Sequence, residues 1–84
     1  MRDSYEHPFA RFDRTGKRAT LRRVTSVEGF APLIPAADTG ATVPRGEIRA
    51  VLTISTDSPR CVTFDYYTSL PAAWARFRRE RDRH

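Results

Sequence analysis

The chain has a single cysteine, Cys61, and only two histidines and four glycines among its 84 residues. One cysteine can form neither an intramolecular disulfide nor a CxxC metal motif. His7 and His84 lie near opposite ends of the chain, and neither has a nucleophile or a carboxylate at a catalytic or metal-binding spacing. Glycine-rich phosphate-binding motifs are also missing. We therefore expect no enzyme activity, no metal site and no cofactor.

Long hydrophobic runs are also missing. No apolar segment approaches the length that a membrane-spanning helix needs, and residues 1–8 lack the apolar core of a secretory signal. A lone cysteine fits a reducing compartment. These observations predict a soluble cytoplasmic protein that does not contact a membrane.

Apolar residues make up 39% of the chain and aromatic residues 11%, which is enough for a small hydrophobic core. This composition differs from that of disordered chains, which are poor in such residues. At 84 residues the chain is long enough for one domain, which we expect to span 1–84.

Lysine is almost absent, because Lys17 is the only lysine among 15 basic residues and the rest are arginines. The formal net charge is +5. A balance this basic favours a nucleic acid, a nucleoprotein or an acidic protein surface as the partner. The planar guanidinium of arginine suits paired contacts to phosphate or carboxylate groups.

Two β-hairpins are predicted. In the first, strands over 9–13 and 18–27 flank a short turn in which Gly16 takes a left-handed conformation. In the second, strands over 47–56 and 61–67 flank the turn 57–60. Alternation places Ile48, Ala50, Leu52 and Ile54 on one face of the third strand.

A C-terminal helix is predicted to begin after Ser69, a suitable N-cap, with Pro71 in its first turn. Leu70, Ala73, Trp74 and Phe77 form one apolar stripe at helical spacing. The stripe stops after Phe77, because the next position of the pattern is Arg81. We expect residues 78–84 to form a charged helix end that projects or frays.

The segment between the two hairpins, residues 30–46, contains three prolines and two glycines, so we expect no regular element through most of it. Phe30, Leu33 and Ile34 are expected to tether its first half, and 36–46 to form a mobile loop. The fold class is therefore α+β: a small antiparallel sheet of about four strands, covered by one helix. An SH3-like or OB-like barrel is the alternative, if the loop holds a short strand near 41–43.

Arginines on both hairpins and on the helix are the candidate binding residues. Tyr66 and Tyr67 are adjacent in one strand, so one of them must face away from the core. Exposed aromatic side chains beside guanidiniums can stack on unpaired bases, and arginines contact phosphates. The predicted site comprises Arg22, Arg23, Arg49, Tyr66, Tyr67, Arg76, Arg78, Arg79, Arg81 and Arg83.

This pattern predicts a small, basic, non-enzymatic binding protein that engages nucleic acid or a nucleoprotein complex through its arginines. The alternative is a stoichiometric protein–protein inhibitor or adaptor, of the kind that bacterial phages and plasmids carry, which docks on an acidic protein surface. The sequence leaves open the identity of the partner and the oligomeric state. An exposed hairpin edge permits dimerisation by sheet extension.

Overall fold

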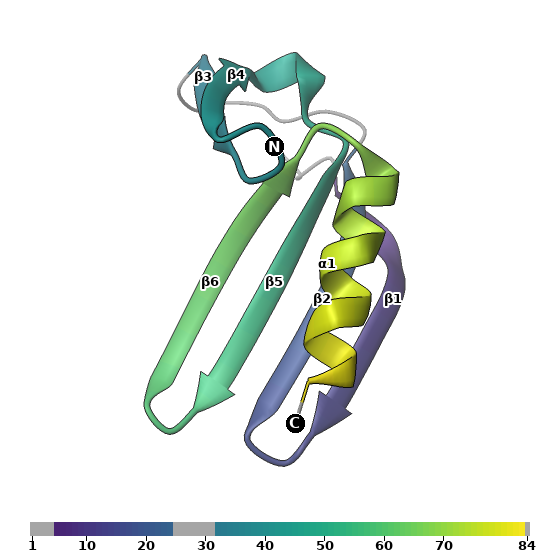
Figure 1. Ribbon diagram of the computed structural model, residues 1–84, viewed down its shortest axis with the longest axis vertical. Helices are drawn as coiled ribbons and strands as arrows, with labels where there is room; N and C mark the ends of the chain where they lie inside the picture. The colour runs from purple at the N-terminus through teal and green to yellow at the C-terminus, as the bar shows by residue number, and fades with distance from the viewer. Residues whose placement is uncertain (1–4, 25–31, 84) are drawn as a thin grey trace.

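The computed structural model of the chain describes residues 5–24 and 32–83 (Figure 1). Its elements, in chain order, are β1 (Tyr5–Arg14), β2 (Lys17–Val24), β3 (Leu33–Ala36), β4 (Ala41–Pro44), the 3-10 helix η1 (Arg45–Glu47), β5 (Ala50–Asp57), β6 (Arg60–Tyr67) and α1 (Leu70–Asp82). The predicted end of the second strand, 25–27, and the predicted tether Phe30 lie outside the described residues, as does His84.

One mixed sheet of six strands, in the order β1-β2-β5-β6-β3-β4, forms the body of the fold. Neighbouring strands are antiparallel except for β3 and β6, which are parallel and paired at Ala36 and Tyr66. The predicted α+β class is confirmed, but the prediction of about four strands is wrong in number. The barrel alternative anticipated a strand near 41–43, which is present as β4. The described pairing is nevertheless linear, with β1 at one end and β4 at the other.

Both predicted hairpins are present. Arg14 pairs with Lys17 across the first turn, and Gly16 has the expected positive φ of 85°. In the second hairpin Asp57 pairs with Arg60. Two-residue turns of this kind hold adjacent strands in fixed register, so simple alternation sets the faces of β2, β5, β6 and of β1 from Ala10 onward. Before Ala10 the pairing of β1 with β2 is irregular.

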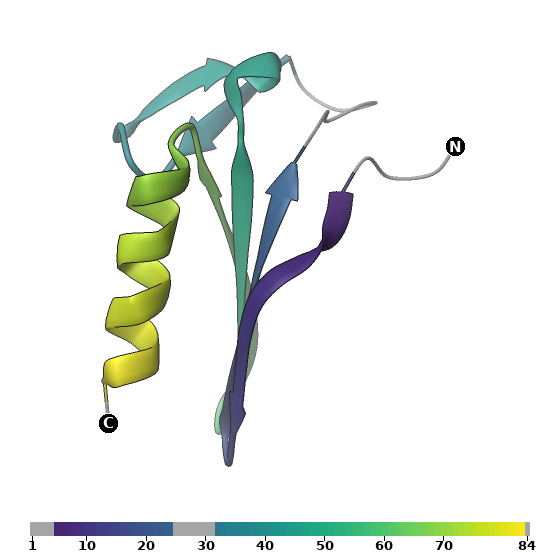
Figure 2. The ribbon, with the colours of Figure 1, turned by 90° about the vertical axis from the view of Figure 1, so that its right-hand side faces the viewer.

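Helix α1 lies against one face of the sheet (Figures 1 and 2). The hydroxyl of Ser69 caps it by accepting a hydrogen bond from the Ala72 N–H at 3.3 Å, as the sequence predicts. Ala73 and Phe77 pack into a core with strand residues Ala19, Leu21, Ala50, Leu52, Ile54 and Tyr67. Trp74 is only partly buried against this core.

The helix end predicted to project or fray, residues 78–84, is regular as far as Asp82. Helix α1 continues to Asp82, and the Arg83 N–H bonds the Arg79 carbonyl oxygen at 3.1 Å. The inward position after Phe77 is taken by Glu80, three residues on, and not by Arg81. Glu80 is 3% exposed, so the charged end of the helix stays against the sheet.

The segment 36–46, expected to be a mobile loop, instead contains regular structure. Strands β3 and β4 form a hairpin in which Gly40 adopts a φ of 72°, and η1 follows directly. Prolines are tolerated here because the strands are short and β4 lies at the edge of the sheet. A second buried cluster joins this hairpin to the neighbouring strands: Val24, Ile34, Ala36, Ile48 and Val51. Ile48 precedes β5 and belongs to this cluster, not to the face predicted for it.

Candidate functional site

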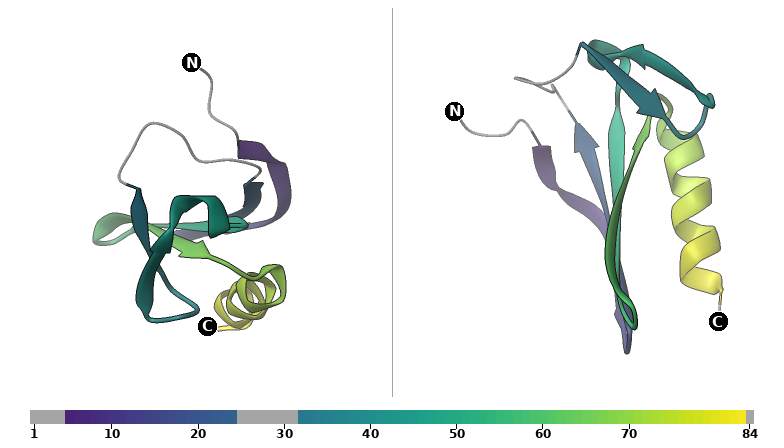
Figure 3. Two further views of the ribbon diagram at one scale, coloured as in Figure 1. Left: turned by 90° about the horizontal axis from the view of Figure 1, so that it is seen from above. Right: turned by 90° about the vertical axis from the view of Figure 1, so that its left-hand side faces the viewer.

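The face of the sheet opposite α1 is covered, among the described elements, only at the end near β3 and β4 (Figures 2 and 3). Because Leu21 and Leu52 point into the core below the helix, alternation directs their neighbours to the other side. We call this second side the open face. It carries Arg11, Asp13, Arg18, Thr20, Arg22, Val24, Val51, Thr53, Ser55, Asp57, Arg60, Val62, Phe64 and Tyr66.

One row across the open face runs from a guanidinium to an aromatic ring. Arg11 pairs with Thr20 in β2, Thr20 with Thr53 in β5, and Thr53 with Phe64 in β6. Three strand spacings separate Arg11 from Phe64, about 14 Å. Phe64 is 59% exposed, an unusual position for a phenylalanine. Thr20 and Thr53 thus place two short polar side chains between the Arg11 guanidinium and the Phe64 ring.

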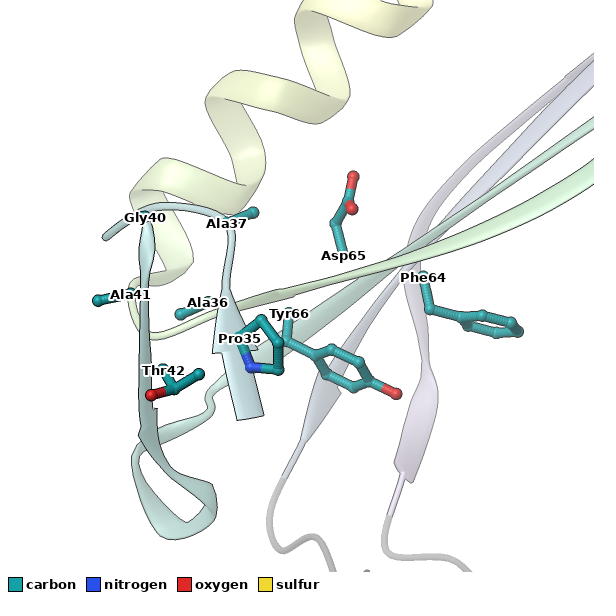
Figure 4. A pocket seen from close by; sticks show the side chains of 9 residues that line it. All are labelled: Pro35, Ala36, Ala37, Gly40, Ala41, Thr42, Phe64, Asp65 and Tyr66. Carbon is teal, nitrogen blue, oxygen red and sulfur yellow. The ribbon is translucent and has the colours of Figure 1, made fainter. Parts of the chain in front are cut away.

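The next row leads into a hollow beside β6. Arg22 pairs with Val51, and Val51 with Tyr66. Figure 4 shows the Tyr66 ring beside Pro35, with the Phe64 ring on the same side of β6. The hollow has a volume of about 550 Å³ and is lined by Pro35, Ala36, Ala37, Gly40, Ala41, Thr42, Phe64, Asp65 and Tyr66. Two aromatic rings two residues apart thus border an open, mostly apolar recess.

The arginines of the open face are unequally neutralised. Arg18 forms an ion pair with Asp57, with Nη2 and Oδ1 3.2 Å apart, and both side chains are about half exposed. Within the described part of the chain, no carboxylate lies within ion-pair distance of Arg11 or Arg22. These two guanidiniums are therefore available to an external anion.

The predicted helix arginines lie on the other side of the sheet. Arg76 Nε donates to Glu80 Oε2 at 2.8 Å, Arg83 Nη1 lies 3.9 Å from the same oxygen, and Arg81 pairs with Asp82 at 3.1 Å. The predicted site combines arginines of the helix with arginines of the sheet. The structure separates them, and several already have an acidic neighbour.

Glu80 is the centre of a buried ion cluster. Burial alone would raise the pKa of this carboxyl, but hydrogen bonds from Lys17 and Arg76 hold the pKa below its ordinary value. Burial would lower the pKa of Arg76, and the hydrogen bond to Glu80 raises it instead. These charges therefore anchor the helix to the sheet. Arg78, Arg79, Arg81 and Arg83 are exposed on this side, and of these Arg81 and Arg83 have a carboxylate within ion-pair distance. Arg78 lies 6.0 Å from the centre of the Trp74 ring.

The remaining predicted residues are dispersed. Arg23 is exposed but belongs to the same face of β2 as Leu21, away from the open face. The Arg49 guanidinium donates to the Gly46 carbonyl oxygen at 2.9 Å. Tyr67 is 3% exposed, and its burial, with the nearby Asp65 carboxylate, raises the pKa of its phenol. It packs in the core and presents no ring to a ligand.

Of the ten predicted site residues, the structure therefore brings only Arg22 and Tyr66 together on the open face. Sequence reasoning missed Arg11, Arg18 and Phe64. The alternation of Val62, Phe64 and Tyr66 against Thr63, Asp65 and Tyr67 was visible, but it does not tell which set faces the core. The more apolar residues of a strand normally face the core. In β6 the side that faces the core is the one that carries Tyr67, so Val62, Phe64 and Tyr66 point to the open face instead.

Among residues 5–24 and 32–83, no group of three or more histidine, cysteine, aspartate and glutamate side chains gathers as a metal ion would require. No helix in the same ranges has both the length and the apolar character to cross a bilayer. Comparison of the chain with protein-family models, curated proteins and solved structures finds no match.

Proposed function

We propose that this chain is a non-enzymatic protein that binds single-stranded nucleic acid on the open face of its sheet. The observation that carries the proposal is the placement of the exposed Phe64 ring opposite Arg11 across one row of the sheet. Unpaired bases stack on aromatic side chains, and guanidiniums contact the phosphates that link them. A cytoplasmic location fits this proposal and the single cysteine.

The arrangement favours a single strand over a duplex. Phe64 and Tyr66 lie two residues apart on β6, so their rings can accept neighbouring bases. A base can stack on them only if its face is free, as in an unpaired strand. Arg11, across Thr20 and Thr53 from Phe64, and Arg22, across Val51 from Tyr66, can then meet the backbone of the same nucleic-acid strand.

The proposal is tested by fluorescence anisotropy with a labelled single-stranded oligonucleotide, a duplex of the same sequence and a series of salt concentrations. We expect tighter binding to the single strand. If the two free arginines and Arg18 each contact one phosphate, log affinity falls against log salt with a slope of about −2. Absence of binding at low salt would refute the proposed function.

The role of the ring is tested at Phe64 itself. Phe64→Leu keeps an apolar side chain but removes the stacking surface, and we expect affinity to fall roughly 5- to 150-fold. Leu33, which is 52% exposed on β3, offers a matched control, since Leu33→Ala removes a comparably exposed apolar side chain away from the open face. Equal losses in the two variants would count against stacking.

A second candidate function is docking on an acidic protein surface through helix α1. It is favoured by Arg78 and Arg79, which are exposed on a helix whose charged end is held firmly against the sheet. Arginine is common among interface residues that contribute strongly to binding. Replacing Arg78, Arg79, Arg81 and Arg83 with alanine would abolish this docking and leave nucleic-acid binding on the open face unchanged.

A further inference from the structure

Strand β6 has a long unpaired edge. It pairs with β5 along its whole length, but on its other side the described pairing to β3 is limited to Tyr66 and Ala36. Residues 60–64 are all exposed. In Figure 1 this part of β6 borders the sheet, and α1 lies over the other strands.

The direction of the backbone groups along this edge follows from one hydrogen bond. The Tyr66 carbonyl oxygen accepts from the Ala37 N–H at 2.7 Å, so the polar groups of Tyr66 point away from β5. In an antiparallel ladder this direction alternates from residue to residue. The N–H and C=O groups of Phe64, Val62 and Arg60 therefore also point outward, where no described strand pairs with them.

Within the described part of the chain, no strand, bulge, proline or lysine protects the 61–64 stretch of this edge. Natural proteins blunt exposed edges with prolines, lysines, bulges or inward-pointing charges. The register between β5 and β6 continues without a bulge from Asp57–Arg60 to Ala50–Tyr67. The stretch 61–64 contains neither proline nor charge, and Val62 and Phe64 are 51% and 59% exposed. Its residue types favour strand pairing.

We propose that two copies of the chain associate through this edge, with the two β6 strands antiparallel and Val62 facing Val62 of the second copy. This inference does not depend on the proposed nucleic-acid binding. A two-fold axis through Val62 gives three hydrogen-bonded positions: Val62 opposite Val62, and Arg60 opposite Phe64 on either side. Apolar side chains then meet, each guanidinium faces an aromatic ring, and no like charges oppose each other.

The neighbouring register is less favourable. With the axis through Thr63, Arg60 would face Tyr66, whose outward carbonyl already accepts from Ala37. The register through Val62 leaves that bond intact and uses all three free residues. It also directs the turn between β5 and β6 of the second copy toward the open hollow that Asp65 and Tyr66 help to line. A second copy is thus complementary to this edge in backbone hydrogen bonding and in the side chains that face each other.

Opposite charges at Val62 test the association. By sedimentation or native mass spectrometry the wild type should have twice the 9.6 kDa mass of one chain. Val62→Lys and Val62→Glu each place like charges across the axis and should be monomeric, whereas an equal mixture should restore the dimer. A monomeric wild type, dimers of either single variant, or failure of the mixture to associate would overturn the proposal. Circular dichroism would check that the variants fold, which we expect because Val62 is 51% exposed.

A disulfide tests the register. Cys61 would lie opposite Thr63 of the second copy in a pair without hydrogen bonds, where Cα atoms are about 4.5 Å apart and a disulfide can form. Oxidised Thr63→Cys should run as a covalent dimer, and Thr63→Cys with Cys61→Ser should not. Cross-linking of the double variant would indicate the axis through Thr63 and overturn the register. Phe64→Leu should keep the dimer, so failure of this proposal and failure of nucleic-acid binding are separable.

Discussion

The Lys17 ammonium and the Glu80 carboxylate lie 2.6 Å apart, joining the turn of the first hairpin to the last turn of the helix. The two residues are 63 positions apart in sequence. Lys17 is mostly buried and Glu80 almost completely so, with side-chain exposures of 22% and 4%. A charge buried in this way is stable only while its partners are present. This pair therefore fixes where the helix ends on the sheet.

Stability should fall in acid because of Glu80. Its pKa is lowered in the folded protein, so the unfolded chain takes up the proton first, near the ordinary value of 4.5. The stabilisation is thus complete above this pH and is lost as pH falls through the lower native pKa. We expect Glu80→Gln to unfold more easily at pH 7 and to show a weaker loss between pH 5 and 3. Denaturant titrations at several pH values measure both effects.

Asp57→Asn provides the control for that experiment. Asp57 pairs with Arg18 on the surface, where both side chains are about half exposed and such pairs contribute little. Its free energy of unfolding at pH 7 should match that of the wild type closely. A loss as large as that of Glu80→Gln would show that burial of the Glu80 cluster is not what matters.

Arg14 is expected to stabilise the end of the helix. Its guanidinium donates to the carbonyl oxygens of Glu80 and Arg81, with Nη2 3.0 Å from the first, and its carbon lies 4.8 Å from the centre of the Phe12 ring. These carbonyls belong to the last turn, which lacks partners within the helix. Arg14→Ala should lower the free energy of unfolding by about 1–2 kcal/mol. Hydrogen exchange should accelerate at the end of α1 and not at its start.

Phe77 should matter more than Trp74. Phe77 is 2% exposed and packs against the Phe12 and Trp74 rings, with centroid distances of 5.7 and 5.6 Å. Phe77→Ala should cost about 3–5 kcal/mol, much of the stability of a domain of this size. Trp74 is only partly buried, so Trp74→Ala should cost clearly less. Thermal or urea unfolding ranks the two, and the reverse order would contradict the packing described.

Asp38 should hold the β3–β4 hairpin against the start of the helix. One of its carboxylate oxygens accepts from both the N–H and the hydroxyl of Thr68, at 3.1 and 2.9 Å. Asp38→Ala leaves these donors unpaired and should cost about 1–3 kcal/mol. Thr39→Ala, in the same turn, loses only bonds to Ala36 and Ala41 within the β3–β4 hairpin and serves as the comparison. Similar losses in both variants would indicate a general weakening of the turn.

The strands of both hairpins and the helix follow from the sequence because their signals are local. Alternation predicts the burial of Leu52 and Ile54, and Ser69 with Pro71 predicts the start of α1. Strand β3 escapes prediction, and β4 enters only with the barrel alternative, because Pro35 and Pro44 usually exclude strands. Their tolerance depends on being short and near an edge, which is a property of the whole sheet.

The site is less predictable than the fold for a related reason. Whether Phe64 or Tyr67 faces the core is decided by which side of β6 the helix covers, and no local pattern states this. Similarly, Arg81 continues the apolar spacing of the helix, but Glu80 takes the inward position because Lys17 is there to neutralise it. Contacts between distant residues determine both outcomes.

Since Lys17 is the only lysine of the chain, the ion pair with Glu80 also occupies its only side-chain amine. Acetylation or an amine-directed dye would have to compete with that carboxylate. Such a reaction would remove the positive charge and release the end of the helix. The rate at which an acylating reagent modifies Lys17 therefore reports how often this end of the molecule opens.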